Sequence, residues 1–135
     1  MIVVDTNVIV YLYISSERSR QAERLLSIDP QWGAPLLWRS EFRNVLARYL
    51  RRKLLSLDDV FLIIRQAESL LANREYEVPS TQIMQLVNSS TCSSYDCEFV
   101  ALAQDLAVPL ITADKQILQQ FPSIAKPIET YESGE

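Results

Sequence analysis

Short apolar runs alternate with longer amphipathic stretches along this chain, and the two kinds of stretch predict different elements. The apolar runs, read as strands, lie near residues 2, 33, 77, 110 and 128, with the second expected over 32–37 and the fifth over 126–130. In the first run, Ile2, Val3 and Val4 are β-branched and do not alternate with polar residues, which is typical of a strand buried on both faces of a parallel sheet. The stretches between the runs carry apolar residues at spacings of three and four, which predicts helices. This order predicts an α/β fold, a three-layer sandwich in which helices flank a mainly parallel sheet.

Polar residues at the ends of the amphipathic stretches predict where the helices begin. We expect Thr6 or Asn7 to cap the first helix, Ser56 to open a capping box, and Ser94 to cap the helix that leads to the fourth strand. The helices after the first are predicted over residues 17–28, 38–53, 56–73, 80–88, 95–107 and 115–121. Residues 1–131 are predicted to form one domain, followed by a frayed tail over 132–135.

Length and composition agree with one small domain. The chain has 135 residues, of which 48% are hydrophobic, enough to form a core. Charged residues interrupt every apolar stretch and no basic and apolar leader precedes the first strand, so we expect a soluble protein of the cytoplasm that does not enter a membrane. Cys92 and Cys97 match no redox or zinc motif and are expected to be small core residues in a reducing compartment.

Missing residue types restrict the chemistry that this sequence can perform. Without histidine, a Ser-His-Asp or Cys-His nucleophile and a histidine-ligated metal are excluded. With only Gly33 and Gly134, the sequence has neither a glycine-rich phosphate loop nor a dinucleotide fingerprint, so no nucleotide cofactor is expected. Catalysis must then use carboxylates, hydroxyls, amides, Lys or Arg, and carboxylates favour hard divalent cations.

Charge is distributed unevenly between the two parts of the chain. Residues 1–53 hold nine Lys or Arg and five Asp or Glu, a balance of +4, whereas residues 54–135 hold four and twelve, a balance of −8. This asymmetry predicts a basic surface for a nucleic acid or an acidic partner, although solvated helix faces can also produce much of it.

Four carboxylates are the candidates for chemistry. Asp5 and Asp114 follow the strands near residues 2 and 110, and the carboxyl ends of neighbouring parallel strands share one crevice. Asp96 begins the preceding helix, and Glu41 lies close to the inward stripe of its own helix. Each alone is explained as a cap or a charge partner. Together they repel one another unless protons or a cation neutralise them, and oxygen ligands favour Mg²⁺ or Mn²⁺.

Four segments that contain these carboxylates carry a family resemblance. They are DTN at 5–7, RSEFRNVL at 39–46, YDCEFVALA at 95–103 and LITADK at 110–115. In this order they resemble a PIN-domain ribonuclease, specifically a VapC-type toxin of a type II toxin–antitoxin system. The resemblance covers essentially the whole chain and implies a PIN-like fold.

The resemblance also implies an activity and partners. It implies metal-dependent endonucleolytic cleavage of RNA that leaves 5′-phosphate and 3′-hydroxyl ends, a VapB-type antitoxin that neutralises the toxin, and a homodimer. Residue by residue, the acidic quartet matches Asp5, Glu41, Asp96 and Asp114, and neighbouring polar positions match Thr6, Asn7 and Thr112.

The resemblance implies a role for each carboxylate. Asp5 and Asp96 are expected to hold Mg²⁺ or Mn²⁺ directly, and Asp114 directly or through water. Glu41 is expected to position a water or to help a second ion. Thr112 is expected to hold Asp114 or a metal-bound water, or else to be only a β-branched strand residue.

Contacts with RNA or the antitoxin are assigned to basic and aromatic residues of the first half. The candidates are Arg39, Arg43, Tyr11 and Trp38. Alternatively, the arginines form a solvated face and the aromatic rings belong to the core. Tyr95 either stacks on a base or packs against the sheet, and Glu98, about 200° around the helix from Asp96, is expected to face elsewhere.

Three other classes of protein share part of this pattern. A phosphatase of the haloacid-dehalogenase type needs a second Asp two residues after the first, where this chain has Asn7. A response-regulator receiver needs an acidic pair near its first strand, which is missing here. The remaining alternative is a PIN-fold module that binds RNA or protein without catalysis.

Overall fold

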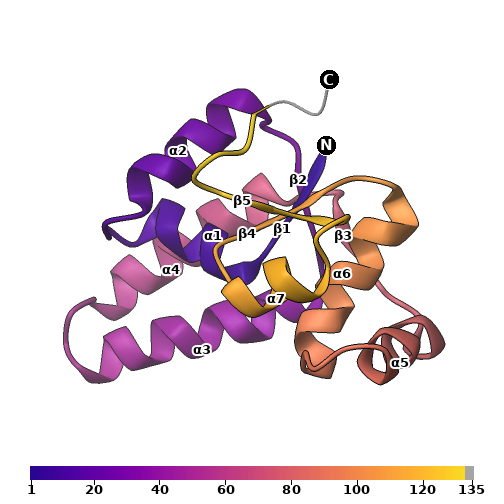
Figure 1. Cartoon of the computed structure of the whole chain (residues 1–135). Helices are drawn as coiled ribbons and strands as arrows, with labels where there is room; N and C mark the ends of the chain where they lie inside the picture. Colours follow the sequence, from indigo (N-terminus) through magenta and orange to yellow (C-terminus); the bar gives the residue numbers. More distant parts are fainter. Residues whose placement is uncertain (133–135) are drawn as a thin grey trace.

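The computed structural model describes residues 1–132, which form a parallel sheet covered by helices on both faces (Figure 1). The described part of the chain has five strands and seven helices. In chain order they are β1 (Ile2–Val4), α1 (Thr6–Tyr13), α2 (Ser19–Ile28), β2 (Trp32–Pro35), α3 (Leu37–Arg51), α4 (Leu57–Leu70), β3 (Glu75–Tyr76), α5 (Ser80–Asn88), α6 (Ser94–Leu106), β4 (Leu110–Thr112), α7 (Lys115–Gln120) and β5 (Ala125–Pro127).

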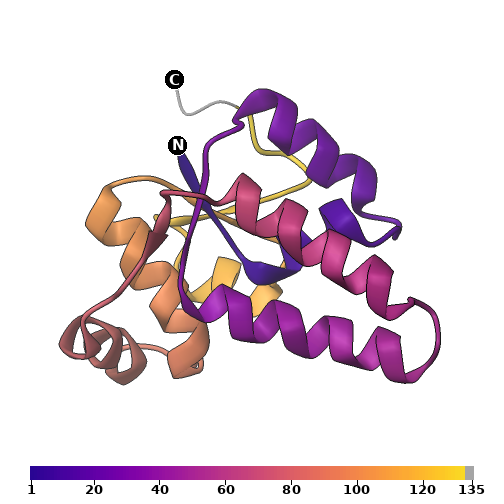
Figure 2. The ribbon, with the colours of Figure 1, turned by 180° about the vertical axis from the view of Figure 1, so that it is seen from behind.

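The sheet has the strand order β3-β2-β1-β4-β5, and every neighbouring pair is parallel. This confirms the predicted α/β class and makes the sheet fully parallel. On one face α6 packs against β1, β2 and β4, and α5 packs on α6. In the other layer α1 contacts α2, α3 and α4, and α3 contacts α4; Figure 2 shows α2 and α4 on that side. Because β1 and β4 are central neighbours, their carboxyl ends lie side by side.

Two helix caps lie one residue before the polar residue that was expected to cap, and for the first helix the alternative interpretation of Asp5 as a cap is confirmed. Asp5, with an extended backbone, is the N-cap of α1, and its carboxylate accepts a hydrogen bond from the backbone N–H of Asn7 at 3.4 Å. Ser93 rather than Ser94 caps α6. In both cases the residue just before the predicted cap already holds the extended backbone that a cap requires. The capping box of Ser56 and Asp59 at the start of α4 is confirmed.

The ends of the short strands differ from the prediction because partner strands set them. The second strand was expected to reach residue 37 but ends at Pro35, and β3 therefore pairs only through Glu75 and Tyr76. The fifth strand was expected over 126–130, but it covers Ala125–Pro127, opposite the three residues of β4. In each case the ladder of hydrogen bonds decided the length, which the local sequence does not encode.

The core lies between the sheet and its helices and includes the two cysteines. Cys92 and Cys97 are buried free thiols, as predicted. No helix among residues 1–132 is long and apolar enough to cross a membrane. Of the predicted tail, Glu132 is exposed, and positions 133–135 lie outside the described residues.

Candidate functional site

A hollow of about 220 Å³ opens at the carboxyl ends of β1 and β4, bounded by α1, α3, α6 and α7. Its lining residues are Asp5, Thr6, Asn7, Glu41, Asn44, Val45, Asp96 and Asp114. The structure thus brings all four carboxylates of the predicted quartet to one place, although 109 positions separate the first from the last in the sequence (114 − 5).

Asp5 follows β1 directly, and hydrogen bonds fix both of its carboxylate oxygens. The hydroxyl of Thr112 donates to Oδ2 of Asp5 at 2.8 Å, while Oδ1 faces the backbone N–H of Asn7. The same Thr112 hydroxyl accepts a hydrogen bond from the backbone N–H of Asp114 at 2.9 Å. Thr112 therefore links the ends of β1 and β4, and its side chain holds Asp5 rather than the Asp114 carboxylate.

Glu41 is positioned by a contact between α1 and α3. The hydroxyl of buried Thr6 donates to Oε1 of Glu41 at 2.7 Å. Because Asp5 caps α1, the side chain of Thr6 is free to make this bond. No other hydrogen bond to the Glu41 side chain is found within residues 1–132, so Oε2 remains available to a ligand.

Asp96 and Asp114 stand at the first turns of α6 and α7. The backbone N–H of Asp96 donates to Oγ of the cap residue Ser93 at 3.1 Å, which fixes the backbone at this point. Oδ1 of Asp114 accepts from the backbone N–H groups of Gln116 and Ile117 at 2.8 and 3.1 Å. Asp114 therefore caps α7 with one oxygen and still lines the hollow.

The electrostatics of the hollow disfavour its negative charges. Burial raises the pKa of Asp5 to about 6, and the neighbouring Asp96 and Glu41 add to this effect, against the hydrogen bonds from Thr112 and Asn7. Burial also raises the pKa of Glu41 and of Asp96; Asp96 contributes to the shift of Glu41, and Asp114 to that of Asp96. None of the ion pairs formed within residues 1–132 involves these carboxylates.

The donor set of the hollow suits a hard divalent cation. Carboxylate, hydroxyl and amide oxygens are the ligands that Mg²⁺ and Mn²⁺ prefer. A cation would also supply the positive charge that the raised pKa values show to be missing. Across the described chain, no three or more His, Cys, Asp or Glu side chains form a group already arranged to hold a metal.

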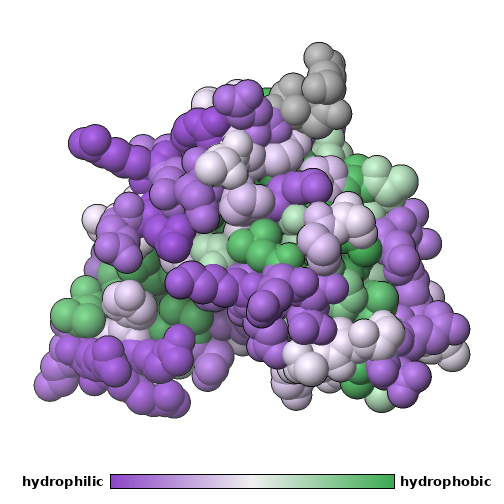
Figure 3. All heavy atoms as spheres, viewed as in Figure 1, coloured by the Kyte–Doolittle hydropathy of each residue, from purple (hydrophilic) through white to green (hydrophobic). Residues whose placement is uncertain are grey.

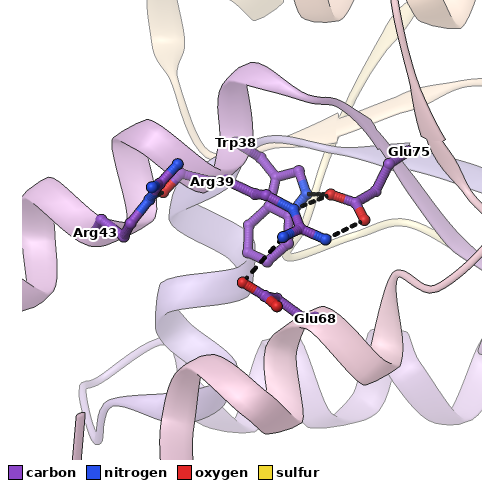
Figure 4. A network of polar contacts seen from close by, with 5 residues as sticks. All are labelled: Trp38, Arg39, Arg43, Glu68 and Glu75. Carbon is purple, nitrogen blue, oxygen red and sulfur yellow. Dashed lines mark hydrogen bonds and ion pairs between the residues drawn. The ribbon is translucent and has the colours of Figure 1, made fainter. Parts of the chain in front are cut away.

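Two of the predicted contact residues, Trp38 and Arg39, bind other side chains of the protein itself (Figure 4). Trp38 was a candidate for contact with RNA or the antitoxin, with the core as the alternative. It is 1% exposed, and its indole N–H donates to Oε2 of Glu75 at 2.8 Å. The core alternative therefore holds for Trp38, whose ring packs beside Phe42. The Arg39 guanidinium donates to both oxygens of Glu75 at 2.6 and 2.7 Å and pairs with Glu68 at 3.1 Å. It is thus committed to a contact among α3, α4 and β3.

The other predicted contact residues remain candidates. Arg43 is exposed, and its Nε donates to the backbone carbonyl of Arg39. Tyr11 is half-buried, and burial raises the pKa of its phenol, with Asp5 and Asp114 contributing.

Sequence reasoning missed Asn44 and Val45, which also line the hollow. Asn44 lies three residues after Glu41 on α3 and therefore shares its face, so helical spacing was the available signal. Glu98 does not line the hollow, as expected, but its charge still raises the pKa of Glu41. Tyr95 is 62% exposed and does not pack against the sheet.

Comparison with known proteins gives the family. The model of the PIN domain matches residues 2–124. The chain is 30% identical to ribonuclease VapC3 of Pyrobaculum aerophilum over 129 residues, 93% of this chain and 98% of that protein.

Solved structures show the same fold. A crystal structure of a Pyrobaculum aerophilum protein covers 94% of this chain and 90% of its own at 16% identity, with a TM-score of 0.74. A toxin–antitoxin complex from Klebsiella pneumoniae contains a chain that covers 98% of this one and is itself fully covered, at 19% identity with a TM-score of 0.69. The sequence match, the shared fold and the position of the acidic hollow agree, and the chain belongs to the PIN-domain family.

Proposed function

We propose that this protein is a metal-dependent endoribonuclease toxin that acts in the cytoplasm and is neutralised by a cognate VapB-type antitoxin. The observation that carries the proposal is the hollow in which Asp5, Glu41, Asp96 and Asp114 converge without a cationic partner among residues 1–132. The similarity to a ribonuclease over nearly the whole chain supports RNA as the substrate.

Asp5 and Asp96 would hold Mg²⁺ or Mn²⁺ directly, and Asp114 directly or through water. The ion, when bound, supplies a Lewis acid that stabilises negative charge developing on the phosphate oxygens and lowers the pKa of a water. The hydroxyl of Thr112 keeps Oδ2 of Asp5 in a fixed orientation for this task.

Glu41 is the candidate to position the attacking water and take its proton. Its Oε1 is held by Thr6, which leaves Oε2 to accept the proton. Because burial raises the pKa of Glu41, its carboxylate is a better proton acceptor than an exposed glutamate. The water oxygen would attack phosphorus in line and the bond to the 3′ oxygen would break. The 3′ oxygen would take a proton from solvent water, so that the products carry a 5′-phosphate and a 3′-hydroxyl.

An antitoxin partner and a homodimer complete the proposal. One of the solved structures with this fold is described as a toxin–antitoxin complex, which supports a protein partner of that kind. Arg43 and Tyr11 are the contact residues that the structure leaves accessible at least in part.

The test is cleavage of labelled single-stranded and structured RNAs with Mg²⁺, with Mn²⁺ and with a chelator. We expect cleavage that requires the metal and falls by at least about a hundredfold in Asp5→Asn and Asp96→Asn, because the charge that holds the ion is removed. Asp105→Asn is the matched control, since Asp105 is an exposed residue of α6 outside the hollow. Equal cleavage by all four proteins would refute the catalytic assignment. RNA binding without cleavage by the wild type would favour a non-catalytic binding module.

A further inference from the structure

The side of α3 that lines the acidic hollow continues beyond it into basic residues. Glu41, Asn44 and Val45 line the hollow. An α-helix turns by about 100° per residue, so Arg48, seven positions after Glu41, lies only about 20° from it around the helix axis. Arg52, the C-cap residue of α3, lies about 20° from Glu41 in the other direction. Arg48 and Arg52 form the arginine pair of α3.

The arginine pair begins close to the hollow. Arg48 is about 10 Å beyond Glu41 along the helix axis and about 6 Å beyond Asn44. Side chains of an α-helix lean toward its N-terminus, and α3 runs away from the hollow, so this lean directs the side chain of Arg48 back toward the hollow. Figure 3 shows hydrophilic side chains at the lower left of the molecule, where α3 runs in Figure 1.

The charges of the arginine pair are not neutralised within residues 1–132. Both residues are exposed, and none of the ion pairs among the described residues includes them, whereas Arg39 on the same helix pairs with two glutamates. Like charges four positions apart on a helix repel each other. The C-terminus of a helix favours cations, but this preference does not select the side of α3 that lines the hollow. An anionic ligand beside the hollow would remove the repulsion.

The backbone of RNA carries that negative charge. The proposed nuclease site must accept a phosphate among four carboxylates, in a chain with a net charge of −4. A cationic side chain inside the hollow would pair with the carboxylates that are kept for the metal ion. Cations one and two turns farther along α3 attract the neighbouring phosphates and leave those carboxylates free.

We propose that Arg48 and Arg52 bind backbone phosphates of the RNA on one side of the bond that is cleaved. This inference rests on the proposed function and names residues that hold its substrate. Contacts with phosphates carry no sequence information, so the arginine pair contributes to RNA binding whatever the sequence.

The experiment measures fluorescence anisotropy of a short, labelled, single-stranded RNA at a series of KCl concentrations, with a chelator present so that no metal-dependent cleavage occurs. Each lost phosphate contact should lower the slope of log affinity against log salt concentration by about 0.7. Arg48→Gln is expected to weaken binding by about fivefold at low salt and to lower the slope by about 0.7; removal of both arginines lowers it by about 1.4. Arg48→Lys keeps the charge and should stay within about twofold of the wild type.

Arg65→Gln is the matched control. Arg65 is an exposed residue of α4 outside the hollow, and no ion pair within residues 1–132 includes it. The substitution changes the net charge as Arg48→Gln does, but the affinity and the salt slope should match those of the wild type. In the cleavage assay with Mg²⁺, Arg48→Gln should raise KM and leave kcat nearly unchanged, because the contact is made equally in the bound substrate and the transition state.

Four results would overturn the inference. They are equal affinities of wild type and Arg48→Gln, including no measurable binding by either; a loss in Arg48→Gln without a change in the salt slope; an equal loss in Arg48→Lys; and an equal loss in Arg65→Gln. The first result would leave the arginine pair to an acidic protein partner. Because the binding assay needs neither metal nor cleavage, failure of this inference is distinguishable from failure of the proposed function.

Discussion

Two groups of carboxylates lie near α3, and they differ in whether a positively charged side chain pairs with them. In the Arg39 cluster, which consists of Trp38, Arg39, Glu68 and Glu75, every carboxylate has a guanidinium partner (Figure 4). In the acidic hollow, Glu41 lies only two residues after Arg39 on α3, yet no carboxylate of the hollow has a cationic partner among the described residues.

The pKa values of the two groups move in opposite directions. The hydrogen bond from Arg39 holds the pKa of Glu75 below its usual range, whereas burial raises the pKa of Asp5 to about 6. A paired carboxylate stabilises the fold, and an unpaired one in a hollow lowers stability until a ligand supplies positive charge. The comparison therefore separates carboxylates that serve the fold from carboxylates that are kept for function.

Removal of the guanidinium should have the largest effect on the fold. We expect Arg39→Met to lower the free energy of unfolding by about 2 to 3 kcal/mol, because Glu75, whose side chain is 13% exposed, loses its charge partner. Urea denaturation followed by circular dichroism measures this loss. An unchanged midpoint would show that the Arg39 cluster is not structural.

Removal of a carboxylate charge from the hollow should change the free energy of unfolding in the opposite direction. Asp5→Asn should raise the free energy of unfolding by about 1 to 3 kcal/mol near neutral pH, because it removes a charge whose pKa is raised from 3.8 to about 6. Between these two pH values the folded wild type binds more protons than the unfolded chain, so its stability falls as the pH rises.

The gain from Asp5→Asn should therefore be complete above about pH 6 and should disappear below about pH 4. Thermal unfolding of both proteins across this range tests the sign. If Asp5→Asn is less stable than the wild type at neutral pH, the charge of Asp5 does not lower the stability of the folded protein and the prediction is wrong.

A smaller effect is expected at the link between the two strand ends. Thr112→Val keeps the shape of a fully buried side chain but removes the donor to Asp5 and the acceptor for the Asp114 backbone N–H. We expect a loss of about 1 to 2 kcal/mol in stability, since two hydrogen bonds disappear. We also expect slower RNA cleavage, because Asp5 is no longer oriented. Thr112→Ser keeps a hydroxyl and should therefore retain both hydrogen bonds and the cleavage rate of the wild type.

The smallest effect belongs to the exposed part of the Arg39 cluster. The Glu68 side chain is 38% exposed and that of Arg39 is 36% exposed, and pairs of this kind contribute less than about 1 kcal/mol. Glu68→Gln should therefore unfold within about 0.5 kcal/mol of the wild type in the urea assay. A loss as large as that in Arg39→Met would mean that the three charges act as one unit.

Much of the fold could be predicted because it depends on local patterns. The β-branched run of Ile2 to Val4 and the capping box at Ser56 each encode their element directly. The length of β3 could not be predicted, because pairing with Ala34 and Pro35 limits it. The one-residue shift of the first cap also depends on tertiary structure, since Thr6 is engaged by Glu41, 35 positions away.

The carboxylates of the site could be predicted from the sequence, but the side chains that contact the neighbouring residues could not. Asp5 and Asp114 follow strands, and strand ends can be read from the sequence. The hydrogen bond from Trp38 to Glu75 could not be predicted, because the two residues lie 37 positions apart and no helical or strand period connects them. Asn44 was overlooked although its spacing from Glu41 gave the signal.

The most direct test of the central claim is calorimetric titration of Mn²⁺ into three proteins without RNA: the wild type, Asp5→Asn and Glu75→Gln. If the unpaired carboxylates are kept for a cation, the wild type and Glu75→Gln bind alike, and Asp5→Asn binds at least about tenfold more weakly. If the wild type binds no Mn²⁺, or if Asp5→Asn binds as tightly as the wild type, the acidic hollow is not a metal site and the account is wrong.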